Sequence, residues 1–152
     1  GSDERYLHRG LPYGVAFTGL WSLFVPLIAP GVVDALEPEM ERLKALCFRL
    51  DVATVHAYAP MGPRSFYARD FAPLLGIPED PVTGSANAAL GALLARAGVV
   101  PRREGKVLLT VYQGHHLGNP GVVEVQVEYS PTGEPYSVQI GGEAVIVQTG
   151  EV

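Results

Sequence analysis

The chain has 152 residues, 47% of them hydrophobic, which is enough for one domain to bury a core without a disulfide or a metal ion. It carries 16 acidic and 11 basic residues, for a formal net charge of −5. Because the basic residues are few and scattered, this composition argues against a protein that binds nucleic acid, and we expect a single domain over residues 1–152.

The first third of the chain predicts two strands and one helix. Two extended apolar runs, residues 13–18 and 22–26, lie on either side of the turn-forming Gly19. Residues 38–50 then place apolar side chains at helical spacing, and Pro38 suits the first turn of a helix. We expect an amphipathic helix there, on the surface of the domain.

A helix without a polar face is the most unusual predicted element. Two strand-like runs precede it, residues 52–58 and 65–71, joined by a loop at residues 60–63. Residues 83–97 then form a helical segment that is apolar on nearly all sides, and Gly98 follows where a helix commonly ends. Such a helix must be surrounded by protein, and its small residues suggest that strands approach it closely.

The rest of the chain predicts hairpins, because turn-forming sequences at residues 130–133 and 141–142 separate alternating or β-branched runs. The fold class is therefore α+β, with a curved, mostly antiparallel sheet or barrel around one central buried helix at about residues 83–97. The amphipathic helix at about residues 38–50 covers the outside. The strands expected in this part of the chain are residues 106–113, 123–129, 136–140 and 144–149.

Cysteine usage and hydropathy predict a cytoplasmic protein. Cys47 is the single cysteine, so no internal disulfide can form. The most apolar stretch, residues 20–33, is too short to cross a bilayer and is interrupted by prolines and a glycine, and we see no signal peptide. Gly1 and Ser2 are typical of residues left by cloning, which would hide the natural start of the chain. We expect no contact with a membrane.

The start of the apolar helix is the candidate site. Its first-turn N–H groups and the positive end of the helix dipole form a site for an anion such as a carboxylate. Gly84 leaves the backbone accessible, Thr83 and Ser85 offer hydroxyl groups, and Asp80 lies close enough to exchange protons with a ligand. The alternative is that Asp80, Thr83 and Ser85 only cap the helix, and spacing alone leaves both interpretations open.

Several motifs resemble those of one known family. The sequences RDFAP at residues 69–73 and GIPEDPVTGSA at residues 76–86 are similar to the signature of the PhzF-like (phenazine biosynthesis) isomerases, whose fold is that of diaminopimelate epimerase. Residues 18–27, 113–121 and 138–150 resemble the family's opening strand, Gly-rich loop and closing hairpin. Together these stretches cover nearly the whole chain in the family's order.

The resemblance implies that the chain is equivalent to the C-terminal lobe of a two-lobed enzyme, with the active site between the lobes. It implies that Asp80 is a catalytic acid that handles protons. Thr83, Gly84 and Ser85 would bind the substrate, with the backbone N–H groups of the last two holding its carboxylate. The principal acid/base glutamate belongs to the first lobe, and the resemblance implies neither a cofactor nor a metal ion.

Two positions depart from the family pattern. Asn119 stands where the Gly-rich loop usually carries an arginine, which removes a fixed positive charge and points to a different substrate preference. The cysteine pair of the true epimerases is also absent, since Cys47 lies on a different predicted helix. A racemisation that uses two thiols is therefore not expected from this lobe.

We expect no catalytic or metal-binding role for the other polar and aromatic residues that stand out in the sequence. His115 and His116 point to opposite sides of an extended chain and lack a third ligand nearby, so we expect no metal site there. We interpret His8 and His56 as isolated residues with surface or satisfied roles, Glu124 and Glu128 as solvated charges, and Trp21 as a core or interface residue.

Two functions compete at this stage. The first is an isomerase, or a subunit or fragment of one, that moves a proton on a small carboxylated metabolite in a phenazine-biosynthesis-like reaction. It would need a homodimer or a separate first-lobe polypeptide to complete its cleft, and the lobe should expose an apolar face. The second is a non-catalytic small-molecule-binding or assembly module that keeps the scaffold without the catalytic glutamate.

Overall fold

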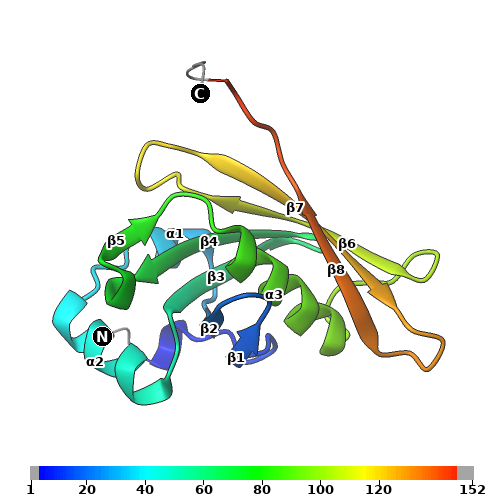
Figure 1. Cartoon of the computed structure of the whole chain (residues 1–152), viewed down its shortest axis with the longest axis horizontal. Helices are drawn as coiled ribbons and strands as arrows, with labels where there is room; N and C mark the ends of the chain where they lie inside the picture. The colour runs from blue at the N-terminus through cyan, green and yellow to red at the C-terminus, as the bar shows by residue number, and fades with distance from the viewer. Residues whose placement is uncertain (1–3, 147–152) are drawn as a thin grey trace, which may run out of the picture.

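The computed structural model describes residues 4–146 as one curled sheet with a helix on its concave side (Figure 1). The strand order is β1-β2-β3-β4-β6-β7-β8, and β5 pairs with β4 outside that path. Most neighbours are antiparallel, but β2 with β3 and β4 with β6 are parallel pairs. The strands are β1 (Gly14–Phe17), β2 (Trp21–Pro26), β3 (Thr54–Gly62), β4 (Ser65–Ala72), β5 (Ile77–Asp80), β6 (Lys106–Gln113), β7 (Gly121–Tyr129) and β8 (Pro135–Gly141).

The central helix is α3 (Gly84–Arg96), and it contacts strands from both ends of the sheet, β1 and β2 at one end and β6, β7 and β8 at the other. Its bounds agree with the predicted helix to within one residue. Its small residues permit close contact with the sheet, since a Cβ atom on Gly91 would lie 2.5 Å from a methyl carbon of Val125. The expected α+β fold around a central buried helix is confirmed.

Strands β3 and β4 bury both faces, which sorts their side chains into an inner and an outer set. Tyr58 and Phe66 point inward, where they share a core with Leu90 and Leu94 of α3. The alternate positions point outward to a second core, which includes Val33 of the short helix α1 (Pro30–Asp34). The same alternation positions the charged residues of the site.

The remaining differences from the predicted elements have local causes. Helix α2 (Met40–Leu50) begins two residues later than expected, because its N-cap is Glu39 and Pro38 precedes the helix. Two elements escaped prediction: α1 is too short to show helical periodicity, and β5 contains Pro78, which is tolerated on this short edge strand. Short 3₁₀ turns occur at Glu4–Tyr6 and Pro73–Leu75.

Two predicted boundaries in the sheet were wrong. The proposed loop at residues 60–63 is mostly strand, since β3 continues to Gly62 before the chain turns. Residues 142–146 are not a strand, and the rest of the expected strand at 144–149 lies outside the described residues, as do Gly1 and Ser2. None of the helices between residues 4 and 146 combines the length and apolar character that a bilayer crossing requires.

Cys47 is expected to resist thiol reagents in the folded protein. It is fully buried on the inner side of α2, where burial raises the pKa of its thiol and the charge of Asp70 adds to the rise. The reactive thiolate is therefore scarce even at pH values where an exposed cysteine, with a pKa of about 8.5, is half ionised. Labelling with a disulfide reagent should be complete in concentrated urea and negligible without it. Rapid labelling of the native chain would contradict this placement.

Candidate functional site at the start of the central helix

Two signature stretches, residues 69–73 and 76–86, fold against each other through the pairing of β4 with β5. Asp70 and Asp80 are partners in register across these strands. Because neighbouring residues of a strand point to opposite faces, Arg69 and Glu79 lie on the outer face and Asp70 and Asp80 on the inner face. Each stretch therefore contributes one charged residue to each side of the sheet.

On the outer face, Arg69 anchors β5 to the rest of the domain. Its guanidinium donates two parallel hydrogen bonds to the carboxylate of Glu79, at 2.9 and 2.7 Å. The remaining terminal nitrogen donates to the backbone oxygens of Val33, Asp34 and Leu36 at the end of α1. The guanidinium of Arg69 thus bonds β5 and the end of α1 at the same time. These bonds hold β5, the strand that ends in Asp80.

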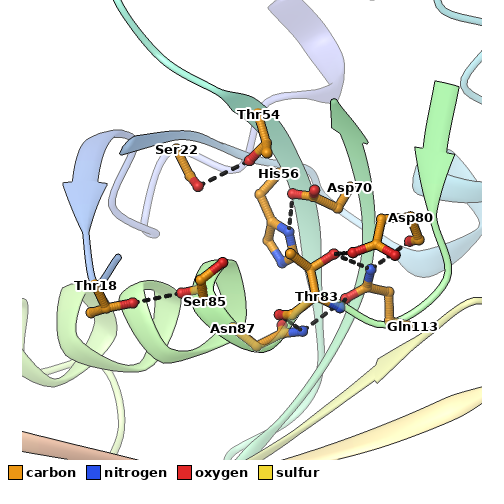
Figure 2. A network of polar contacts seen from close by, with 10 residues as sticks. All are labelled: Thr18, Ser22, Thr54, His56, Asp70, Asp80, Thr83, Ser85, Asn87 and Gln113. Carbon is orange, nitrogen blue, oxygen red and sulfur yellow. Dashed lines mark hydrogen bonds and ion pairs between the residues drawn. The ribbon is translucent and has the colours of Figure 1, made fainter. Parts of the chain in front are cut away.

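On the inner face, hydrogen bonds assign a donor or acceptor role to each group around Asp80 (Figure 2). The amide nitrogen of Gln113 donates to the Thr83 hydroxyl at 2.9 Å and to the backbone oxygen of Asp80 at 2.7 Å. The Thr83 hydroxyl in turn donates to Oδ2 of Asp80 at 2.7 Å. Oδ2 of Asp80 is thus held as an acceptor, and among the described residues Oδ1 takes part in no hydrogen bond.

Gln113 is the residue that organises this site, and sequence reasoning missed it. Its buried amide oxygen accepts from the backbone N–H of Thr83 at 3.2 Å and from the side-chain amide of Asn87 at 2.7 Å. Together with its two donated bonds, these use the full capacity of the amide. Only its place at the end of a predicted strand, just before the Gly-rich loop, marked Gln113 in the sequence.

The start of α3 has no side-chain cap. Thr83 is the N-cap residue, but its hydroxyl bonds Asp80 instead of a helix N–H. Among residues 4–146, no acceptor bonds the backbone N–H groups of Gly84, Ser85 and Ala86. Gly84 and Ser85 are half-buried, so the opening of the helix is reachable from solvent. The interpretation of Asp80, Thr83 and Ser85 as mere caps is therefore wrong.

Neighbouring segments shape the entrance to this helix start. The Thr18 hydroxyl, which follows β1, donates to the backbone oxygen of Ser85 at 2.7 Å. At Gly84 a Cβ atom would lie 2.8 Å from the end of the Ile140 side chain on β8, so a larger residue there would crowd β8 against the first turn of α3. The N–H groups, the carboxylate of Asp80 and the Ser85 hydroxyl, which has no partner among residues 4–146, together form a candidate site with donors for an anion and one proton acceptor.

His56 was expected to be isolated, in a surface or satisfied role; it is neither isolated nor at the surface, and one of its two ring nitrogens has a partner. The side chain is fully buried on the inner face of β3, and Nδ1 lies 2.9 Å from Oδ1 of Asp70, which is its partner in register on β4. His8, in contrast, lies near the surface, where Nδ1 accepts a hydrogen bond from the N–H of Gly10. One of the two histidines therefore lies beside the candidate site.

The Gly-rich loop after β6 packs on the segment between β5 and α3. Gly114 has φ +84°, and a Cβ atom there would lie 2.2 Å from the backbone oxygen of Asn119 and 2.7 Å from that of Pro81. The side chain of Asn119 is exposed. His115 and His116 are exposed as well, and the ring of His115 lies against aromatic rings of β4 and β6.

The other residues singled out from the sequence lie elsewhere. Among residues 4–146, no group of three or more His, Cys, Asp or Glu side chains is arranged to hold a metal ion. Glu124 is exposed, but Glu128 is not simply solvated: Lys106 bonds it at 2.9 Å and lowers the pKa of its carboxyl. Trp21 is half exposed beside Phe17, which excludes a core role.

Comparisons with known proteins point to one family. The sequence profile of the phenazine biosynthesis-like protein (PhzC-PhzF) family matches residues 1–150. An uncharacterized isomerase of Deinococcus radiodurans is 51% identical over 99% of the chain and 48% of its own length. A PhzF-family structure from Bacillus anthracis superposes with a TM-score of 0.74, at 24% identity, over 95% of this chain and 52% of that one.

A more distant structure shares the fold. A probable proline racemase from Agrobacterium radiobacter matches with a TM-score of 0.50 at 13% identity, over 80% of this chain and 38% of that one. The chain spans about half the length of the relatives that it matches, 48% for the Deinococcus radiodurans protein.

Proposed function

This chain belongs to the phenazine biosynthesis-like protein family, and we propose that it forms one lobe of an isomerase that moves a proton on a small carboxylated metabolite. The observation that carries the proposal is the start of α3, where no side chain among residues 4–146 caps the first N–H groups. Asp80 lies just before this turn, and its carboxylate accepts a hydrogen bond from the Thr83 hydroxyl. The isomerase names of the matched relatives support the same reaction class.

In the proposed reaction, the substrate carboxylate docks on the N–H groups of Gly84 and Ser85, with the Ser85 hydroxyl as a further donor. These donors hold the substrate in place and stabilise negative charge that develops when a carbon loses its proton. Asp80 takes up that proton on Oδ1, or returns one to a different carbon. A second acid or base on the facing lobe completes the transfer, so that the substrate is isomerised without a net change in its atoms.

We propose that the facing lobe is a separate first-lobe polypeptide or a second copy of this chain. Strand β1 supports this, because Tyr13, Val15 and Phe17 on or next to it are exposed, with Trp21 beside them. Val15, Phe17 and Trp21 lie on the face of the sheet that points away from α3, and exposed apolar side chains of this kind are typical of a covered surface. A cytoplasmic location is part of the same proposal, and the unpaired cysteine agrees with it.

Gly84→Ala is expected to weaken carboxylate binding by about tenfold, because the new methyl group would lie 2.8 Å from the end of the Ile140 side chain and crowd the first turn of α3. Benzoate is a suitable probe, titrated into the ¹⁵N-labelled chain while the amide signals of Gly84, Ser85 and Ala86 are followed by NMR. Gly141→Ala is the matched control, since no atom lies within 4 Å of its added Cβ, and it should bind as the unchanged chain does. Amide shifts that are absent from the α3 start would contradict the proposed site.

A binding module without catalysis would use the same anion site, so binding alone does not separate the two functions. Exchange of a carbon-bound proton does. When the cleft is complete, an isomerase exchanges that proton with deuterium from D₂O, and the module does not.

A further inference from the structure

Three residues in register across β3, β4 and β5 form a polar row beneath the start of α3. His56 is paired with Asp70, and Asp70 with Asp80, so all three side chains point to the inner face. His56 and Asp70 are both 0% exposed. Figure 2 shows the His56 ring between Asp70 and the first turn of α3, with its second nitrogen directed away from Asp70 toward that turn.

Three buried polar atoms in this region have no hydrogen-bond partner among the described residues: Nε2 of His56, Oδ2 of Asp70 and Oδ1 of Asn87. Orientation of the Asn87 amide is settled, because its nitrogen donates to the backbone oxygen of Thr83 and to the amide oxygen of Gln113. Two of the three atoms are thus acceptors. Within the described part of the chain, Nε2 of His56 has no partner within hydrogen-bond distance as a donor or as an acceptor, so the contact that bears on the charge of the ring is that of Nδ1 with Oδ1 of Asp70, at 2.9 Å.

The charges of the row favour a positively charged His56. Two carboxylates that lie directly opposite on one face of a sheet repel each other, and a bound substrate would add a third negative charge. The buried cation Arg69 is on the outer face and is already used by Glu79. From β2 the neutral Phe24 ring faces His56, and from α3 the neutral Asn87. Among these side chains, His56 is the one on the inner face that can carry a positive charge and balance the carboxylates.

We propose that His56 is a buried imidazolium that neutralises Asp70 and thereby keeps the start of α3 receptive to an anion. The inference rests on the proposed function and deepens it: His56 is a positioning residue that does not touch the substrate. The pair carries no net charge, so that Asp80 alone opposes the incoming carboxylate. Because the charge of His56 cancels that of Asp70, no arginine is required near the start of α3 to balance a second buried carboxylate.

The charge state of His56 can be tested in the unchanged chain without a ligand. In long-range ¹H–¹⁵N NMR spectra, the imidazolium shows a proton on each ring nitrogen, and the neutral ring shows one bare nitrogen. We expect both nitrogens of His56 to be protonated at neutral pH. A bare Nε2 would overturn the proposal, whether or not the chain binds benzoate. This measurement therefore separates failure of the inference from failure of the proposed function.

Charge-matched variants test the effect on the anion site. His56→Gln leaves Asp70 uncompensated, and a buried charge at this range should weaken benzoate binding by about tenfold. The double variant His56→Gln/Asp70→Asn restores a neutral pair and should bind benzoate as the unchanged chain does, while Asp70→Asn alone should bind no more weakly. Equal loss in the double variant would show a structural role for His56 and would overturn the proposal.

Discussion

Replacing Arg69 with Met is expected to lower the free energy of unfolding by about 3–5 kcal/mol. The substitution keeps an unbranched side chain against Phe71, whose ring centroid lies 5.0 Å from the guanidinium. It leaves the Glu79 carboxylate without its partner in a site where the two side chains are only 3% and 9% exposed. It also removes the donor that three backbone oxygens at the end of α1 share.

The chain contains a matched control for this prediction. Arg42 of α2 and Glu39, its N-cap residue, form an ion pair at 2.8 Å through one hydrogen bond, and their side chains are 79% and 59% exposed. Arg42→Met should therefore change the free energy of unfolding by no more than about 0.5 kcal/mol. Urea unfolding followed by circular dichroism measures both variants. Equal stability of the two would mean that the guanidinium of Arg69 does not hold β5.

Asp80→Asn is expected to separate binding from chemistry. Asparagine has the shape of aspartate and its oxygen accepts the Thr83 hydroxyl hydrogen bond equally well, so the network around Gln113 should persist. Removal of a negative charge beside the anion site should tighten benzoate binding severalfold. Loss of the carboxylate should lower proton exchange on the substrate by about 10²–10⁴-fold, the usual contribution of a general acid or base.

The two readouts of Asp80→Asn need different preparations. Benzoate affinity is measured on this chain by NMR, and deuterium uptake from D₂O on the chain combined with the facing lobe. Asp51→Asn is the control, because Asp51 is an exposed carboxylate at the end of α2 with φ 53°, a conformation that asparagine adopts readily. It should leave both readouts unchanged. If Asp80→Asn weakened benzoate binding and left exchange intact, Asp80 would be a binding residue and the proposed mechanism would be wrong.

The arrangement explains why the signature stretches alternate charged residues. In each stretch, one member of an adjacent pair stabilises the fold and the other faces the site: Arg69 and Glu79 hold β5 from outside, while Asp70 and Asp80 lie beneath the helix start. A strand turns neighbouring side chains to opposite faces, so a single pairing of β4 with β5 positions both sets. Loss of the outer pair is therefore expected to displace Asp80 as well as to destabilise the chain.

Much of the fold could be predicted from local patterns. The all-apolar run with a terminal glycine indicated the buried helix, and the alternation in residues 123–129 indicated β7. Elements without a local period were missed. Helix α1 has five residues, and β5 has four residues with a proline, so each depends on a neighbouring strand for its conformation.

The sequence by itself determined the class of the fold and the central helix, and it marked Thr83, Gly84 and Ser85 as a candidate anion site, because hydrophobic periodicity and helix-start chemistry are local properties. Only the tertiary structure decided that Thr83 leaves the helix uncapped, that Gln113 fills the space between β5 and α3, and that His56 meets Asp70. The state of the helix start depends on whether the Thr83 hydroxyl bonds Asp80 or a helix N–H. The His56–Asp70 and Gln113–Asp80 contacts join residues 14 and 33 positions apart in the chain. Hydrogen bonds of that kind are set by strand register, which a local pattern of side chains does not encode.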